Sequence, residues 1–347
     1  MKGQRGLRIQ SRRTTPGSDR TRKALAAVLM PALAVASFAC ASDRAAGRAE
    51  ARLALPMGPA GGSEANLAST QEPDLAITGS QRLGRFKLKK AMHHVRRLAA
   101  RIGVRVRATR GERRGTTYTK NRLRDLGYST DIQKFSVDGR RSRNVVAWWP
   151  GSDKHPLVVG AHIDSVPRSP GANDNASGVA VMLEMARIFA DRRQGQWLRF
   201  VGFGSEEYGR DGRHHVGSEI YVRRLRPRAK DRAPGMISID MIADGRPLIT
   251  GTAGIGPPRV ARAIHRKLDR PDFAVDYRVT CDCSDNGPFE RAGIPAAFVW
   301  SGFEPNYHDP SDTPRRLKKR DLRRTGKAMR VFLREVDRGM IRYFRGV

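Results

Sequence analysis

Residues 157–178, LVVGAHIDSVPRSPGANDNASG, decide the fold and contain the first candidate site residues. The stretch begins with an apolar, β-branched run that predicts a buried strand. The strand delivers His162 and Asp164 to its C-terminal end, a loop rich in proline and glycine carries Asp174, and an apolar helical pattern begins at Ser177. Because ligands of open α/β sheets bind outside the carboxyl ends of strands, this order predicts a site at that edge.

A histidine and two aspartates at a strand end favour a metal site. Asp164 lies close enough to His162 in the sequence to orient its imidazole ring through a hydrogen bond. The same residues also occur as a capping and turn arrangement. This stretch alone therefore leaves a metal site and a structural turn as open alternatives.

Strands and helices alternate along the rest of the chain. Further strands are expected over residues 128–137, 143–149, 197–203, 235–242, 273–279 and 294–300. Helices are expected over 86–102, 116–126, 177–190, 216–225, 259–268, 285–292 and, as a basic amphipathic tail, 321–344. This alternation predicts an α/β fold with a largely parallel central sheet.

The first 80 residues differ in composition from the rest of the chain. Residues 1–41 join a basic start to a short apolar segment and an A-x-A-like tripeptide around Cys40, the layout of a secretory signal peptide. Cys40 permits a second interpretation, a lipoprotein leader. Residues 42–80, rich in Ala, Gly, Ser and Glu, are predicted to be a linker or pro-segment, and 81–347 the folded domain. We therefore expect a secreted or envelope-associated protein.

The net charge of +32 comes from 66 Lys and Arg against 34 Asp and Glu. Such an excess suggests nucleic-acid binding at first. The basic residues are scattered over nearly every segment, and no zinc-finger, helix-turn-helix or aromatic-interleaved RNA motif accompanies them. We therefore expect a solvated basic surface, with electrostatic or lipid-anchored association with an anionic envelope as its use, and no specific nucleic-acid partner. The expected oligomeric state is a monomer.

Three further strand ends carry polar residues. Glu206 and Glu207 follow FVGFGS, Asp240 lies within the apolar run MISIDMI, and His308 lies in PNYHDPSD. An acid inside a buried strand is costly unless it is paired or bound to a metal. Taken singly, each has an ordinary structural explanation. Asp240 could pair with an arginine, Glu206 and Glu207 could be a solvated loop pair, and His308 could be a turn residue. Together with the first stretch, they match a metal pattern at several strand ends.

Five ordered motifs carry a specific resemblance: GAHIDS, GANDNASG, GSEEYG, SIDMI and YHDPSDT. They resemble the motifs of secreted zinc aminopeptidases with two co-catalytic metals, a family that includes bacterial leucyl aminopeptidases and is related to glutamate carboxypeptidase and glutaminyl cyclase. The similarity runs from about residue 88 to the C-terminus. The resemblance implies a three-layer α/β/α sandwich around a mixed, largely parallel sheet, peptide substrates and two Zn²⁺ per chain.

The resemblance also assigns the metal ligands. His162 and Asp240 would bind one zinc, Glu207 and His308 the other, and Asp174 would bridge the two. Mixed histidine and carboxylate ligands suit zinc and leave positions for water and substrate. Two metals about 3.5–4 Å apart can act on one attacking water, and a bridge between them requires a carboxylate with two oxygens.

The remaining roles come from the same resemblance. Glu206 would be the general base rather than a ligand, and Asp164 would hydrogen-bond the ring of the first histidine ligand. Tyr307 matches a tyrosine that in some members helps polarise the substrate carbonyl. The Asp174–Asn175 peptide bond is implied to be cis.

Two features depart from the family or remain open. Asn286, in SDNGPF, replaces a common histidine that is not a metal ligand, so it affects the substrate pocket rather than the metals. Cys281 and Cys283 form a C-x-C pair that an exported protein could oxidise, although a bridge across one residue closes a tight ring. The adjacent His214 and His215 are interpreted as a loop or helix start, since neighbouring histidines cannot easily chelate one metal.

The leading functional hypothesis is a zinc-dependent aminopeptidase with a two-zinc-activated water. A carboxypeptidase of the same family would need a basic pocket, which the widespread arginines do not exclude. A glutaminyl cyclase would use one zinc and a different set of acids. A non-catalytic basic envelope-binding protein would be expected to have lost ligands, and none is missing from the sequence.

Overall fold

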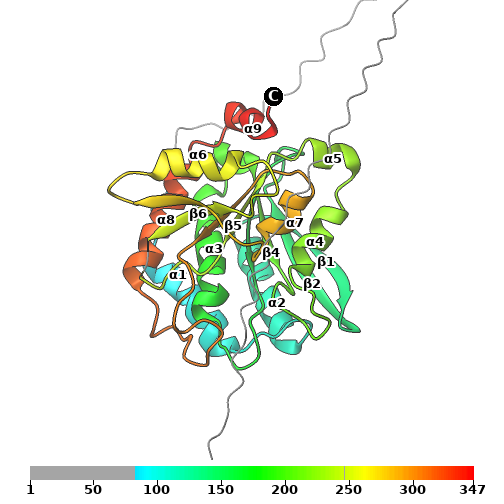
Figure 1. The fold of residues 1–347 in the computed structure, drawn as a ribbon, viewed down its shortest axis with the longest axis vertical. Helices are drawn as coiled ribbons and strands as arrows, with labels where there is room; N and C mark the ends of the chain where they lie inside the picture. The colour runs from blue at the N-terminus through cyan, green and yellow to red at the C-terminus, as the bar shows by residue number, and fades with distance from the viewer. Residues whose placement is uncertain (1–82, 246) are drawn as a thin grey trace, which may run out of the picture. The chain divides into compact units, whose positions relative to one another are not determined.

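The computed structural model describes residues 83–245 and 247–347. The predicted leader (1–41) and linker (42–80) lie outside the described residues, so both stay predictions. The described residues form one eight-stranded sheet in the order β1-β2-β4-β3-β5-β8-β6-β7 (Figure 1). The strands are β1 Ser129–Val137, β2 Arg140–Trp148, β3 Leu157–His162, β4 Leu198–Phe203, β5 Met236–Ile239, β6 Leu248–Thr252, β7 Val275–Val279 and β8 Ala296–Trp300.

Helices separate most of these strands. They are α1 Leu88–Val95, η1 Arg96–Ile102, α2 Arg110–Asp125, η2 Ala172–Ser177, α3 Gly178–Phe189, η3 Arg193–Trp197, α4 Val216–Arg223, α5 Pro227–Asp231, α6 Arg259–Leu268, α7 Asn286–Arg291, α8 Lys319–Leu333 and α9 Arg338–Arg345. Among the helices of the described ranges, none is both long and apolar enough to cross a membrane.

The centre of the sheet is parallel and its flanks are mixed. β3 pairs in parallel with β4 and β5, β5 pairs in parallel with β8, and β6 with β7. The pairs β1/β2, β2/β4 and β6/β8 are antiparallel. The prediction of a mixed, largely parallel sheet is therefore confirmed.

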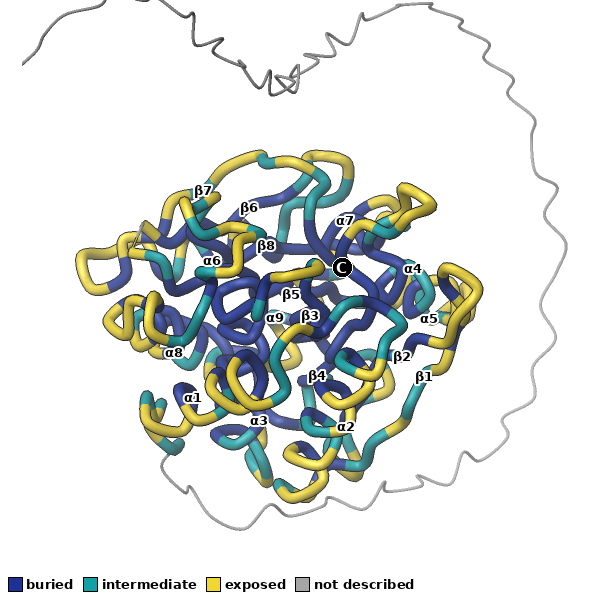
Figure 2. Tube along the Cα trace, turned by 90° about the horizontal axis from the view of Figure 1, so that it is seen from below, coloured by how far each residue is buried: buried dark blue, intermediate teal, exposed yellow. Residues whose placement is uncertain are grey.

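Alternation along the strands divides the core between the two faces of the sheet. Leu157, Val159 and Ala161 of β3 belong to the larger cluster, which includes residues of α1, α3, α6 and α8. Val158 belongs to a second cluster with residues of α4 and α7. Figure 2 shows the strands buried between helices whose outer sides are exposed. These layers make the predicted α/β/α sandwich, with helices on both faces.

The structure differs from the predicted elements at three places. The predicted tail helix over 321–344 is two helices, because Asp337 begins α9 by accepting a hydrogen bond from the Met340 amide (2.8 Å). β6 was not predicted, since glycine and threonine dilute its apolar run LITGT. α2 starts at Arg110, earlier than predicted, where the Thr109 side chain accepts a hydrogen bond from the Gly111 amide.

Candidate metal centre

The predicted site residues all lie at one edge of the sheet. Because β3, β4, β5 and β8 run parallel, their carboxyl ends meet there. β3 ends at His162, the two glutamates follow β4, and Asp240 follows β5 directly. Asp174 comes from η2, and His308 from the loop after β8. The sheet thus brings together side chains separated by up to 146 residues (162 to 308) in the sequence.

Two groups of ligand-type atoms share Asp174. Its Oδ1 lies 3.0 Å from His162 Nε2, and its Oδ2 lies 3.2 Å from His308 Nε2. In the first group, Asp240 Oδ1 lies 3.4 Å from His162 Nε2. In the second, Glu207 Oε2 lies 3.1 Å from His308 Nε2. Within each group the ligand atoms lie within 4.8 Å of one another, as a metal ion requires. The arrangement therefore offers two adjacent cation positions joined by one carboxylate.

The chemistry of this donor set fits divalent metal ions. Asp240 Oδ1, Glu207 Oε1 and His308 Nε2 are buried and have no hydrogen-bond partner within the described chain. Burial, followed by the neighbouring carboxylates, raises the pKa of Glu207 to about 7 and also raises the pKa of Glu206. Several buried carboxylates cannot all ionise without nearby cations. Nitrogen and oxygen donors in this number are typical of zinc.

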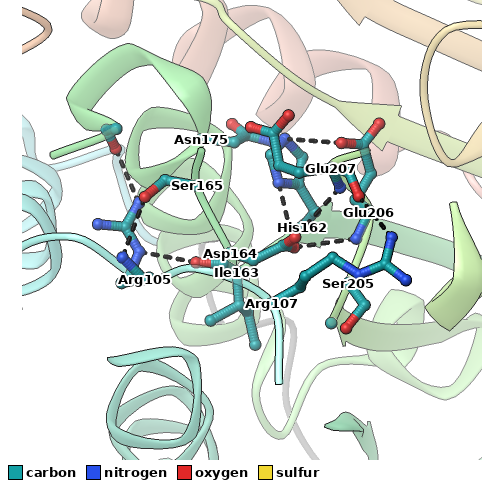
Figure 3. A network of polar contacts seen from close by, with 12 residues as sticks. Arg105, Arg107, His162, Ile163, Asp164, Ser165, Asn175, Ser205, Glu206 and Glu207 are labelled. Carbon is teal, nitrogen blue, oxygen red and sulfur yellow. Dashed lines mark hydrogen bonds and ion pairs between the residues drawn. The ribbon is translucent and has the colours of Figure 1, made fainter. Parts of the chain in front are cut away.

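Asp164 holds the turn that carries the two glutamates. Its Oδ1 accepts a hydrogen bond from the Glu206 amide (3.0 Å), and its Oδ2 accepts one from the Glu207 amide (3.1 Å) (Figure 3). The same Oδ1 lies 3.6 Å from His162 Nδ1, which is longer than a normal hydrogen bond. Asp164 therefore lies beside His162 without the hydrogen bond that the resemblance implied. It fixes the glutamate backbone instead, which the sequence did not predict.

Glu206 has its two oxygens in different surroundings. Oε2 faces the ligands, 3.8 Å from His162 Nε2, whereas Oε1 lies 3.0 Å from His215 Nε2. His215 is 2% exposed and directly precedes α4, and its amide also donates to the Glu206 carbonyl (2.7 Å). The His214 ring stacks on Tyr208, with ring centroids 4.3 Å apart, and its Nδ1 is hydrogen-bonded to His215 Nε2 (3.0 Å). The sequence predicted a loop or a helix start for this histidine pair but missed its contact with Glu206.

Asp312 is a second residue that sequence reasoning missed. It is buried, and its carboxylate accepts hydrogen bonds from the amides of Asn173 (2.7 Å) and Asp174 (3.1 Å). The adjoining Asp174–Asn175 peptide bond is cis, as the resemblance implied. Asp312 lies in the quoted motif YHDPSDT, so the motif itself was the available signal.

Arg105 supports the loop between β3 and η2, which leads to Asp174. It is fully buried and donates hydrogen bonds to three carbonyls between β3 and η2: Ile163 (2.7 Å), Pro170 (2.6 Å) and Gly171 (2.9 Å). Burial lowers its pKa to about 10, against the attraction of Asp164 and other acids of the site. Figure 3 shows Arg105 beside Ser165, whose hydroxyl accepts a hydrogen bond from the Arg105 amide. Nothing in the local sequence pattern distinguishes this arginine from the many exposed ones.

Four of the candidate metal ligands, His162, Asp174, Glu207 and Asp240, line a pocket together with an apolar and aromatic wall. The wall consists of Tyr208, His214, His215, Met241, Cys283, Phe298, Trp300, Phe303 and Tyr307. Among the described residues that line this pocket, none is lysine or arginine. Tyr307 is 36% exposed and stacks on His308, with ring centroids 3.7 Å apart.

The two open features of the sequence lie at or behind this wall. Cys281 and Cys283 are joined by a disulfide, and Cys283 is part of the wall. Asn286 is buried, donates a hydrogen bond to Glu290 (2.8 Å) and does not belong to the described lining of the pocket. Ser284 donates to the Asp240 carboxylate (3.0 Å) and orients that ligand.

Three curated relatives resemble this chain in sequence. It is 32% identical to leupeptin-inactivating enzyme 1 of Streptomyces exfoliatus, over 58% of this chain and 45% of that protein. It is 34% identical to aminopeptidase YwaD of Bacillus subtilis, over 51% and 40%. It is 31% identical to the probable lipoprotein aminopeptidase LpqL of Mycobacterium tuberculosis, over 51% and 42%. The chain spans less than half the length of these relatives.

Solved structures share the fold at lower sequence identity. BSAP, a zinc aminopeptidase from Bacillus subtilis, superposes with a TM-score of 0.64 at 20% identity, over 74% of this chain and 96% of that chain. The glutaminyl cyclase of Porphyromonas gingivalis superposes with a TM-score of 0.63 at 24% identity, over 72% and 98%. The model of peptidase family M28 matches residues 144–333, more than half of the chain. This chain therefore belongs to peptidase family M28.

Proposed function

We propose that this protein is a zinc-dependent aminopeptidase, which removes the N-terminal residue from peptides. Membership of a peptidase family and relatives named aminopeptidases support a metallo-exopeptidase. The observation that carries the choice of aminopeptidase is the charge of the pocket. Its described lining contains four carboxylates and three histidines, but no lysine or arginine.

The terminal charge of the substrate must be matched by this lining. A free α-ammonium group is stabilised by carboxylates, whereas a free α-carboxylate requires a cationic partner. The chain has 66 lysines and arginines, yet none belongs to the described lining of the pocket. This distribution favours an aminopeptidase over a carboxypeptidase. The two ligand groups that share Asp174 favour a two-metal enzyme over a one-zinc cyclase and over a non-catalytic binding protein.

In this proposal each metal has its own ligands. His162 and Asp240 would hold one zinc, Glu207 and His308 the other, and Asp174 would contact both. When bound, the two ions would lower the pKa of a water molecule and polarise the substrate carbonyl. The chain's own residues supply the remaining steps, which are binding of the substrate, proton transfer and orientation.

Glu206 is the proposed general base. Its Oε2 faces the ligands, so it can take the proton of the attacking water and pass it to the leaving amine. His215 holds Oε1 and thereby keeps the other oxygen directed toward the reacting water. Tyr307 is the proposed donor to the carbonyl oxygen, where negative charge develops. Burial, followed by the nearby acids, raises the pKa of Tyr307, so the hydroxyl keeps its proton.

The pocket wall and the disulfide extend the proposal to substrate and location. Phe298, Trp300 and Phe303 form an apolar surface that suits an apolar N-terminal side chain. The Cys281–Cys283 disulfide is typical of exported proteins. With the predicted leader and a relative named a lipoprotein aminopeptidase, it supports a secreted or envelope-associated enzyme.

The test combines metal content with hydrolysis of matched substrates. We expect about two zinc ions per purified chain, cleavage of leucine amide and no cleavage of N-acetyl-leucine amide. Glu206→Gln is the matched control for contaminating peptidases, since it should keep zinc and lose activity. Two zinc ions with release only of C-terminal residues from N-blocked peptides would instead establish a carboxypeptidase. One zinc with cyclisation of N-terminal glutamine would establish a cyclase.

A further inference from the structure

A second hollow lies on the side of the domain formed by α1, η1, α2 and β2. It has a volume of about 590 Å³, and its described lining contains no acidic residue. Five arginines line it: Arg97, Arg113, Arg114, Arg122 and Arg143. We call this hollow the arginine groove. None of its lining residues belongs to the pocket lined by the candidate metal ligands, which we call the metal pocket. The groove is therefore a separate feature of the surface.

The charge of the arginine groove is largely unneutralised. Arg122 pairs with Asp125, whereas the other four arginines form no ion pair with any carboxylate in residues 83–245 and 247–347. Unpaired like charges that converge on one hollow repel one another. A multivalent anion would relieve that repulsion, so the groove is suited to bind one.

A hollow elsewhere on the surface shows that the overall composition does not explain the groove. This other hollow, beside α6 and β7, has a volume of about 750 Å³ and is lined by Arg262, Arg266 and Arg278. Asp269 and Asp276 share its lining, and Asp276 pairs with Arg278 at 2.9 Å. We call it the mixed hollow. It has a similar size and three arginines, but its acids offset part of the charge.

A smaller hollow beside the arginine groove does not extend its positive charge. It has a volume of about 200 Å³, shares His93 and Arg122 with the groove and adds Lys90 and Arg187. Asp125 and Glu184 also line it, and Glu184 pairs with Arg187 (2.7 Å). The unneutralised charge therefore belongs to the groove itself, whose arginines come from η1, α2 and β2. Charges spread over three elements fit a linear polymer better than a single small anion.

Tyr118 argues against a nucleic acid as that polymer. Proteins that bind single strands stack bases on open aromatic rings. Tyr118 is the one phenol ring in the described lining, and the guanidinium groups of Arg97 and Arg122 lie over it, 6.0 and 5.8 Å from its centroid. Its hydroxyl is bonded to His94 Nδ1 (2.6 Å). Guanidinium groups bind phosphate oxygens in pairs, and no base is needed for that contact.

We propose that the arginine groove binds a linear phosphate polymer without nucleobases and so holds the protein on that polymer while the metal pocket stays open. The proposal uses the positive charge that peptide hydrolysis does not require. It does not depend on the proposed peptidase activity, because the two sites share no lining residue.

The test compares two triple variants with the same change of charge. The groove variant is Arg97→Gln, Arg113→Gln, Arg114→Gln, and the control in the mixed hollow is Arg262→Gln, Arg266→Gln, Arg278→Gln. All six side chains are exposed, so both variants should fold. The probe is long-chain inorganic polyphosphate, titrated with the full chain at several salt concentrations.

We expect the groove variant to bind polyphosphate at least about tenfold more weakly than wild type, and the control to bind within about twofold. Loss of three phosphate contacts should also make the slope of log affinity against log salt shallower by about 2, since each contact to a single strand contributes about 0.7. Leucine amide hydrolysis should not change in either variant.

Three results would overturn the proposal. Equal losses in the two triple variants would show that the chain's overall charge causes binding. Single-stranded DNA of equal charge that binds as tightly as polyphosphate would show that bases are accepted after all. Binding to anionic phospholipid vesicles, with none to polyphosphate, would assign the groove to a membrane surface. Should the triple variant aggregate, the double variant Arg113→Gln, Arg114→Gln provides the same comparison against Arg262→Gln, Arg266→Gln.

Discussion

The metal pocket and the arginine groove hold opposite charges in one chain of net charge +32. Acidic groups gather in the pocket, where Asp174, Glu206, Glu207 and Asp240 are all buried. The arginines of the groove lie mostly on exposed helical surface. Sequence-wide charge therefore predicts neither region. What separates them is the sheet edge, which buries the acids, and the α1–α2 surface, which leaves the arginines in water.

Burial makes the two regions respond differently to substitution. A buried charge that loses its partner costs several kcal/mol, whereas an exposed charge is screened by water and salt. Changes in the pocket should therefore have the largest effects on activity. Changes around the groove should act on binding and stability and leave the chemistry intact.

Asp174→Asn should have the largest effect of any single substitution. Each oxygen of Asp174 faces a different histidine, so an amide removes an anionic donor from both metal groups at once. We expect zinc content to fall at both positions and kcat to fall by about 10³ or more. Zinc per chain and leucine amide hydrolysis measure this. The exposed neighbour of His308 offers a control, Asp309→Asn, which should leave both values unchanged.

Normal zinc content in the Asp174→Asn protein would contradict the role of Asp174 as a shared ligand of both metal positions. In that case the buried acids would not form the predicted pair of cation positions.

Glu206→Gln should reduce activity and spare the metals. The change keeps the shape of the side chain and removes the base, whereas every proposed ligand remains. We expect kcat to fall by about 10²–10⁴ at unchanged zinc content. Glu207→Gln is the matched variant one residue away, and it should lose zinc. Equal behaviour of the two variants would contradict the division of roles between adjacent glutamates.

The sequence predicted the parts of the molecule that depend on local pattern. Apart from Arg199 in β4, the strands β3, β4 and β8 are mostly apolar up to their ends. The polar residues at the strand ends converge because parallel strands share a carboxyl edge. The same pattern fails for β6, where glycine and threonine interrupt the run. It also fails at the chain end, where one capping aspartate divides a continuous helical pattern.

Contacts between loops could not be predicted in this way. His215 reaches Glu206 because the loop between them turns back and His215 adopts a left-handed backbone conformation, with φ of 53°. Arg105 is buried because three carbonyls of a distant loop face it. The arginine groove likewise joins residues from 97 to 143 through helix packing. Each feature depends on tertiary arrangement that no local pattern encodes.

His94 lies below the exposed charges beside the groove and should make stability depend on pH. Burial lowers its pKa to about 4, against the attraction of Glu184 and with added repulsion from His93 and Arg122. The unfolded chain, with a pKa of about 6.5, then binds this proton more tightly than the folded protein. Stability is therefore unaffected at neutral pH and falls as the pH drops from about 6.5 to about 4, by up to about 3 kcal/mol.

Urea unfolding at pH 7.5 and 4.5 measures this contribution. His94→Gln should lose less stability between the two pH values than wild type does. His93→Gln changes the exposed neighbour on the same helix and should keep most of the wild-type loss, because burial is the largest cause of the lowered pKa of His94 and repulsion from His93 is a smaller one. An identical acid-induced loss of unfolding free energy in all three proteins would mean that His94 does not contribute to the pH dependence.

Substitution of His215 should give the smallest effect on kcat, and it distinguishes orientation of Glu206 from general stabilisation of the pocket. His215→Met removes the ring nitrogen that lies 3.0 Å from Glu206 Oε1 and 3.0 Å from His214 Nδ1, and His215→Gln can place an amide nitrogen near that position. We expect the methionine variant to lose about tenfold in kcat, equivalent to about 1.4 kcal/mol, at unchanged KM and zinc content. The glutamine variant should recover most of that loss. Both substitutions impose the same backbone strain at φ of 53°, so their difference reports the polar contacts made at the position of Nε2.

In a Glu206→Gln background, His215→Met should cause no further loss, because the contact with Oε1 acts through the base that it orients. A further tenfold loss in that background would mean that His215 stabilises the pocket independently of Glu206.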